Sequence, residues 1–112
     1  MFVVIYQWKL KAGQESHFRE GWRRVTRALI RHRGGLGSRL HEGEAGIWIA
    51  YAQWPDKASW AKSVELGPIN GEPGYEMMEE SIDRAGSPAS PRYTLTVVDD
   101  LFKPELNKLS TV

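Results

Sequence analysis

Four stretches of the chain have the apolar spacing of β-strands, and two of these stretches are apolar on both faces. The two-sided stretches are residues 2–10 and 47–54, which are rich in aromatic and β-branched residues. A strand without a polar side is covered on both faces of its sheet. Residues 36–42, which alternate in polarity, and residues 92–102 complete a set of four predicted strands.

Helical spacing occurs between the predicted strands. Residues 14–32 have one narrow apolar stripe and end before Gly34-Gly35, a pair suited to the C-terminus of a helix. A second helix is expected to begin after Asp56 as its N-cap and to end at Gly67-Pro68. A further helical segment opens at Pro73-Gly74. The stripe of the first helix consists of Phe18, Trp22, Val25 and Leu29.

The predicted elements follow one another in the order β-α-β-β-α-β, the split βαβ pattern of ferredoxin-like domains. The expected fold class is therefore α+β, with a four-stranded antiparallel sheet and helices on one face. Residues 1–103 are expected to form one domain, followed by a short polar tail at 104–112.

The sheet face without helices is expected to be apolar, because two of its strands have no polar side. Such a face is larger than the apolar patch that a monomer normally exposes, and pairing across a two-fold axis would cover it. We therefore expect a homodimer. The alternative is that residues 67–90 and the tail cover this face within one chain.

Composition narrows the range of functions. The 15 basic and 14 acidic residues nearly cancel, whereas a nucleic-acid-binding domain usually has a marked positive charge. The absence of Cys excludes disulfides, thiol catalysis and Cys-based zinc sites. No signal-peptide pattern and no apolar stretch of membrane-spanning length is present. We therefore expect a cytoplasmic protein that binds neither nucleic acid nor membranes.

Three short motifs, in this order, resemble one known family. They are the turn Lys11-Ala12-Gly13 before a helix that contains Phe18, the segment Gly34-Gly35-Leu36-Gly37-Ser38, and Tyr51-Ala52-Gln53-Trp54 followed by Trp60 on the next helix. Over residues 2–102 the chain resembles the antibiotic biosynthesis monooxygenase family of the dimeric α+β barrel superfamily. This resemblance implies that two sheets pair to form a dimeric barrel.

The resemblance also implies an activity. Family members oxidise electron-rich phenols and quinols with O₂, often without a metal or flavin, so no cofactor is expected. Two positions depart from the best-matching enzymes: Trp60 stands where some have a substrate-contacting Tyr, and Ala50 stands where an Asn can bind the substrate. A related branch degrades haem, but its strand-one Asn is Tyr6 here and no His follows His41.

Five residues are candidates for a site that binds a small aromatic ligand. Tyr6, Trp8, Tyr51 and Trp54 are the expected lining residues, and His41 is the candidate catalytic base because imidazole titrates near neutral pH. The pocket is expected between the inner sheet face and the second helix, beside Trp54. The alternatives are that Trp54 only packs in the core and that His41 is a surface residue.

Two functions follow from these residues. The first is a cofactor-independent monooxygenase acting on a small aromatic phenol or quinol. The second is a non-catalytic dimeric α+β barrel protein that binds a small ligand or has a regulatory role.

Overall fold

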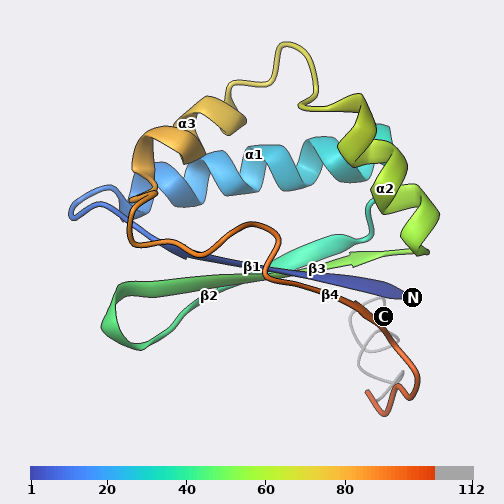
Figure 1. Cartoon of the computed structure of the whole chain (residues 1–112). Helices are drawn as coiled ribbons and strands as arrows, with labels where there is room; N and C mark the ends of the chain where they lie inside the picture. The colour runs from blue at the N-terminus through green and yellow to red at the C-terminus, as the bar shows by residue number, and fades with distance from the viewer. Residues whose placement is uncertain (103–112) are drawn as a thin grey trace, which may run out of the picture.

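Three helices cover one face of a four-stranded sheet (Figure 1). The structure is a computed structural model and describes residues 1–102. The elements are β1 (Phe2–Lys9), α1 (Glu15–Arg33), β2 (Gly37–Glu42), the 3₁₀ turn η1 (Glu44–Gly46), β3 (Ile47–Trp54), α2 (Lys57–Leu66), α3 (Gly74–Ser81) and β4 (Tyr93–Thr96).

The sheet has the strand order β2-β3-β1-β4, and each pair of neighbouring strands is antiparallel. The central strands β1 and β3 are therefore the two that the sequence shows as apolar on both faces. This order and the position of the helices confirm the predicted α+β ferredoxin-like fold.

Strand β4 is much shorter than the predicted strand 92–102. The predicted boundaries were wrong there because β4 pairs only with β1, whose first residue, Phe2, lies opposite Thr96. One further hydrogen bond joins the Val97 amide to the Met1 carbonyl at 3.0 Å. The predicted tail at 104–112 lies outside the described residues.

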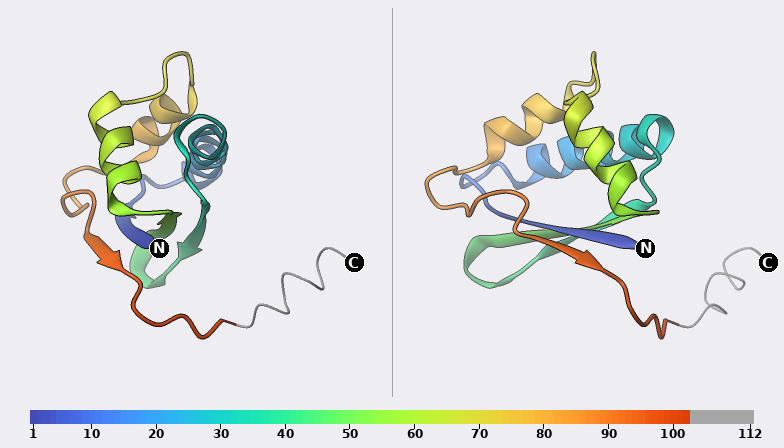
Figure 2. Two further views of the ribbon diagram at one scale, coloured as in Figure 1. Left: turned by 90° about the vertical axis from the view of Figure 1, so that its right-hand side faces the viewer. Right: turned by 45° about the vertical axis from the view of Figure 1, so that its right-hand side comes forward.

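The three helices lie together on one side of the sheet (Figure 2), and specific hydrogen bonds fix their ends. The α1 helix ends at Gly34 in the left-handed conformation, as the glycine pair predicts. At the start of α2 the Asp56 carboxylate accepts a hydrogen bond of 2.7 Å from the Ser59 amide, which confirms the predicted N-cap. The Arg33 side chain, at the end of α1, donates to the carbonyls of Ser63 and Gly67 and so ties α2 to α1.

The two faces of the sheet differ sharply. On the helix side, Trp8 and Trp48 are buried with Phe18 of α1, and Trp54 is buried in a second cluster with Phe2. On the opposite face, Tyr93 and Leu95 keep 54% and 47% of their surface exposed. Residues 97–102 lie against part of this face, and none of the three helices covers the rest of it, because all three lie on the other side of the sheet (Figure 2). No helix within residues 1–102 is both long enough and apolar enough to cross a membrane.

Candidate functional site

A cavity of ≈ 260 Å³ lies between the helix side of the sheet and the helices. Its floor contains Ala50 and Ala52, at the middle of β3. Ala50 lies opposite Tyr6 on β1, and Ala52 lies opposite Ser38 on β2. Two small side chains at the centre of the sheet, with larger ones around them, leave a space that the core side chains do not fill.

Helices α1 and α3 form the roof of the cavity. Trp22 and Leu29 reach it from α1, while Tyr75 and Met78 reach it from α3. At this roof α1 and α3 cross very closely. A Cβ atom added to Gly21 would lie 2.8 Å from the Gly74 carbonyl oxygen, closer than any real contact. Tyr75, which lines the cavity, directly follows Gly74 at this crossing.

A second hollow of ≈ 250 Å³ adjoins the first on the side of α2. Trp60, Val64 and Pro68 line it, and it shares four wall residues with the first cavity. The shared residues are Tyr6, Leu29, Trp54 and Tyr75. The space between the layers therefore extends towards α2, beside Trp54, in the region where the sequence predicts a pocket.

Two buried polar atoms in these walls have no hydrogen-bond partner among the described residues. They are the hydroxyl oxygen of Ser38 and the indole nitrogen of Trp60. Buried polar atoms are nearly always paired, so unpaired ones in the wall of a cavity indicate groups that a ligand or water can satisfy. Ser38 lies in the first cavity and Trp60 in the second.

The Tyr6 side chain stands between the two hollows with its hydroxyl in the interior. Burial raises the pKa of this hydroxyl, the nearby Trp60 indole opposes that rise, and Tyr75 adds to it. Trp60 approaches Tyr6 but makes no well-aligned hydrogen bond with another described residue, so its N–H stays unsatisfied. A neutral phenol in this position can donate a hydrogen bond to an oxygen atom of a ligand.

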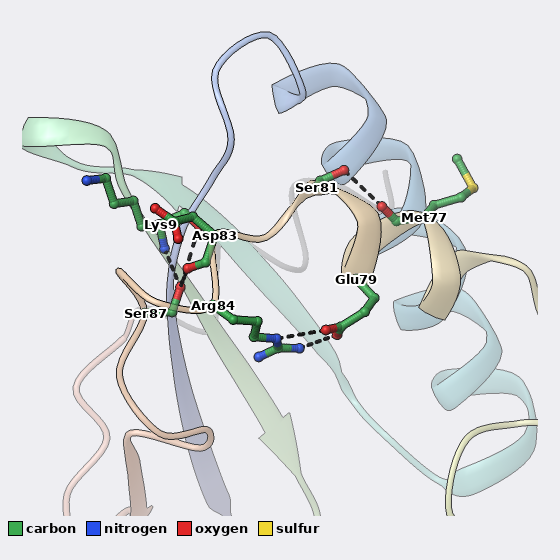
Figure 3. Close-up of polar contacts among 7 residues, drawn as sticks. All are labelled: Lys9, Met77, Glu79, Ser81, Asp83, Arg84 and Ser87. Atoms are coloured by element: carbon green, nitrogen blue, oxygen red, sulfur yellow. Dashed lines mark hydrogen bonds and ion pairs between the residues drawn. The ribbon is translucent and has the colours of Figure 1, made fainter.

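An ion pair marks the solvent side of the cavity. The Arg84 guanidinium donates two hydrogen bonds to the Glu79 carboxylate, the first from Nε to Oε1 at 2.9 Å (Figure 3). These hydrogen bonds are the main reason that the pKa of Glu79 is lowered. Both side chains line the cavity and are more than half exposed. Glu79 is consequently held as a carboxylate of weakened basicity.

The loop that carries Arg84 is attached to the end of β1. Ser87 donates to the Asp83 carbonyl at 2.7 Å and accepts from the Lys9 amide at 2.9 Å (Figure 3). The Ser81 hydroxyl closes the end of α3 by donating to the Met77 carbonyl at 2.8 Å. Glu79 and Arg84 are thus held from two anchored segments, which fixes this edge of the cavity.

The structure brings together three of the five site residues that the sequence suggests. Tyr6, Trp8 and Trp54 all line the first cavity. Side chains alternate between the two faces of a strand, so Tyr6 and Trp8 of β1 point to the same face. Trp54 of β3 points to this face too, because it pairs with Phe2 of β1, and this is the helix side of the sheet.

The other two residues lie on the opposite face, so the expectation of one shared pocket is wrong for them. Leu40 packs against the core under the helices, and its neighbour His41 therefore points the other way. His41 is exposed, and its Nδ1 donates to the Ile49 carbonyl at 3.1 Å. Tyr51 lines a groove on the same outer face, which Leu95 and Phe102 also line. His41 cannot reach a ligand in the cavity of its own chain.

Sequence reasoning missed several cavity residues. Tyr75 and Met78 share a helix face in the sequence, but nothing in that pattern shows that the face lies over the sheet. Ser38 is a serine in an edge strand, and the local sequence does not show that its hydroxyl is buried. Its burial depends on the helices that pack over this part of the sheet. Within residues 1–102, no group of three or more His, Asp or Glu side chains is gathered as metal ligands.

The fold and the cavity together define a class. The protein is a ferredoxin-like α+β domain with a cavity between its sheet and its helices that is lined by apolar and aromatic residues and opens to solvent at one edge. The sequence pattern of the antibiotic biosynthesis monooxygenase family matches residues 1–67, which is more than half of the chain. The chain belongs to this family.

Solved structures share the fold at low sequence identity. SnoaB, a cofactor-independent oxygenase from Streptomyces nogalater, is 12% identical, with a TM-score of 0.67 over 91% of this chain and 97% of that chain. Rv0793 from Mycobacterium tuberculosis is 14% identical, with a TM-score of 0.65 over 90% of this chain and 98% of that chain. A comparison with curated proteins found no match.

Proposed function

We propose that this protein is a cofactor-independent monooxygenase that oxidises a small aromatic phenol or quinol. The observation that carries the proposal is the cavity between sheet and helices, with an alanine floor and aromatic walls. A flat ring can lie over Ala50 and Ala52 and contact the faces or edges of Tyr6 and Trp54. Membership of the family and the fold shared with SnoaB support the same activity.

The proposed reaction takes all its electrons from the substrate. A phenolate passes one electron to O₂, and the resulting phenoxyl radical and superoxide combine at a ring carbon. Protonation gives a hydroperoxide, which loses water and leaves a quinone. One oxygen atom of O₂ enters the product and the other leaves as water, so phenol and O₂ balance quinone and water.

Residues of the cavity would serve this reaction by binding the substrate and by stabilising its negative charge. The neutral Tyr6 hydroxyl, whose pKa is raised by burial, can donate a hydrogen bond to the phenolate oxygen. Arg84 adds a positive charge at the solvent edge, although Glu79 pairs with it. The cavity contains no imidazole from His41, and Arg84 lowers the pKa of Glu79, so the substrate's proton would leave to solvent.

Oxygen uptake tests this proposal. Purified protein is mixed with a panel of quinols and naphthols in an oxygen electrode, and the products are identified by mass spectrometry with ¹⁸O₂. We expect at least one substrate to consume O₂ and to gain a single labelled atom. Trp54→Ala should lower that rate strongly, since Trp54 lines both hollows. Uptake that is equal with boiled protein across the panel would contradict the activity.

The second candidate is a protein that binds a small aromatic ligand without turnover. Two observations favour it: Ala50 supplies no amide in the floor, and the cavity has no histidine among its lining residues. In that case a panel member would bind in the cavity, with the same dependence on Trp54, while oxygen uptake stays at the uncatalysed rate.

We further propose that the protein is a homodimer that pairs through the outer sheet face. The exposed Tyr93 and Leu95 on β4 support this, together with the half-buried Ile49 and Tyr51 on β3. A contiguous apolar face of this kind is unfavourable in water.

A further inference from the structure

We propose that Arg33 is a positioning residue of the ligand site, which acts by holding α2 against the second hollow. Its guanidinium binds Ser63 and Gly67, and both of these residues line that hollow. Arg33 itself is not part of the lining of either hollow. The inference deepens the proposed function, on which it rests only in taking the joined hollows as the ligand site.

The first argument is how little of α2 is buried. Ser63 is the one buried residue of this helix, whereas four residues of α1 are buried. A helix is normally held in place by the burial of a continuous apolar face. On α2, however, Val64 and Leu66 are 58% and 60% exposed, and Trp60, which packs on Phe2, is half-buried. Side-chain packing beyond Trp60 therefore contributes little to fixing α2.

The second argument is the geometry of the Arg33 contacts. Nη1 donates to the Ser63 carbonyl oxygen at 2.8 Å and to the Ser63 hydroxyl at 3.2 Å, while Nη2 donates to the Gly67 carbonyl oxygen at 2.9 Å. The last carbonyl groups of a helix lack partners within it, and a cation there is favoured by the helix dipole. The planar fork of a guanidinium reaches two such carbonyls at once. Arg33 therefore caps the C-terminal end of α2 from a neighbouring helix.

The third argument is the chain on either side of α2. The helix begins two residues after β3 and has the Asp56 cap, so its N-terminal end is fixed to the sheet. Its C-terminal end continues into residues 67–73, where Gly67 and Gly71 have φ values of 75° and 82°. A Cβ atom at either glycine would meet nothing within 4 Å, so neighbouring atoms do not confine the chain at these points. The end of α2 that Arg33 binds is thus its less restrained end.

The position of Arg33 connects two walls of the second hollow. Leu29, one turn earlier on α1, lines this hollow, and residues four apart lie on the same side of a helix. The C-terminal turn of α1 lies beside α2 (Figures 1 and 2). Arg33 therefore joins the wall formed by α1 to the wall formed by α2 and fixes the width between them. Without its hydrogen bonds, the C-terminal half of α2 would move away and widen the hollow.

Hydrogen exchange tests this role without any ligand. Arg33→Met removes all three hydrogen bonds, and Arg33→Lys keeps the charge but not the fork. In Arg33→Met we expect the amides of α2 to exchange at least about tenfold faster than in the wild type, from the loss of one or more well-placed hydrogen bonds. Amides in the middle of α1 should exchange at the wild-type rate. Arg33→Lys should lie between the wild type and Arg33→Met.

Ligand binding under nitrogen tests the consequence for the site. In a calorimetric titration, 2-naphthol should bind Arg33→Met about tenfold more weakly than the wild type, because binding must then also order a wall of the site. Arg31→Met is the matched control, since it removes an exposed arginine from the same last turn of α1. This control should leave both the naphthol affinity and the exchange of α2 unchanged.

Three results would overturn the inference. The first is wild-type exchange of α2 in Arg33→Met. The second is an equal rise of exchange in α1 and α2, which would indicate a general loss of stability. The third is the absence of any difference in naphthol binding between Arg33→Met and the wild type, which would mean that the position of α2 does not affect the ligand.

The outcome also distinguishes this inference from the proposed activity. Faster exchange confined to α2 and weaker naphthol binding in Arg33→Met, without oxygen uptake by the wild type, would support the inference and contradict the oxygenase. Oxygen uptake by the wild type, with unchanged exchange of α2 in Arg33→Met, would support the oxygenase and contradict the inference.

Discussion

Trp54 and His41 lie on neighbouring strands but on opposite faces of the sheet: Trp54 ends β3, and His41 pairs with Ile49 of the same strand. Trp54 is buried beneath the helices and lines both hollows, whereas His41 is exposed on the outer face. The consequence is that two aromatic residues, both plausible from the sequence as site residues, must have very different effects on ligand binding.

Substitution of these two residues gives the first prediction. Trp54→Ala should weaken the binding of an aromatic ligand by about tenfold or more, because it removes a wall of the cavity and a stacking surface. His41→Ala should leave the affinity unchanged. Calorimetric titration with 2-naphthol measures both. A large loss of affinity in His41→Ala, with the fold intact, would show that the cavity is not the ligand site.

Tyr6 gives a prediction about pH. Burial is the largest influence on its hydroxyl and raises its pKa above the ordinary value of 10.0. The folded state therefore favours the neutral phenol. This contribution to stability is fully present below the unfolded-state pKa, about 10, and is lost as the pH rises through the folded-state value.

Two measurements check the behaviour of Tyr6. In an ultraviolet difference titration, the signal that Tyr6→Phe lacks should have its midpoint above 10.0. The free energy of unfolding should also fall more steeply above about pH 10 in the wild type than in Tyr6→Phe. A midpoint below the ordinary tyrosine value would mean that the hydroxyl is stabilised as an anion, the reverse of what its burial implies.

At the scale of the elements, the two helices that form the roof of the cavity, α1 and α3, cross very closely. Gly21 and Gly74 face each other there, and a Cβ on Gly74 would lie 2.7 Å from the Gly21 carbonyl oxygen. The obstructing atoms include backbone, which cannot move aside as a flexible side chain can. Glycine in the middle of α1, otherwise unfavourable for a helix, is needed for this close approach.

Gly21→Ala should therefore destabilise the protein, although alanine is the better helix former. We expect a loss of about 1–3 kcal/mol, the usual cost of overpacking, measured by urea unfolding. Gly35→Ala is the matched control, because its Cβ would meet nothing closer than 3.5 Å. An increase in stability for Gly21→Ala would mean that α1 and α3 are farther apart than the structure shows.

For the whole molecule, the contrast between the two sheet faces is the main feature. The helix side is filled by core residues and the cavity, while the outer side exposes Tyr93 and Leu95 beside a groove of ≈ 480 Å³. Residues 97–102 lie over part of that side, and Arg39 places its guanidinium 5.9 Å from the Phe102 ring centroid. The remaining apolar surface is what the proposed homodimer would bury.

Leu95→Glu should shift the protein towards monomer, because it places a charge in the proposed interface. Leu66→Glu is the matched control, since Leu66 is an exposed leucine of α2, 60% accessible, on the helix side of the sheet. Light scattering at micromolar concentration checks both variants. A wild-type mass of a single chain, 12.7 kDa, would contradict the homodimer itself.

The sequence by itself determined the order and type of the elements. Apolar spacing on both sides predicts strands that are covered on both faces, and the two strands that have it, β1 and β3, lie at the centre of the sheet. Helical stripes, the Gly34-Gly35 pair and the Asp56 cap predict helix ends that the structure confirms. These features are local: each depends on the spacing of side chains or on backbone conformation within a few residues, so the chain order reveals them.

The tertiary structure alone decided which face holds the site. Alternation shows that His41 and Leu40 point in opposite directions, but only the packing of Leu40 beneath the helices shows which direction leads to the cavity. The same holds for Ser38, whose hydroxyl is buried by elements distant in the chain. A period of two separates two faces of a strand without distinguishing them, and only contacts between distant segments remove that ambiguity.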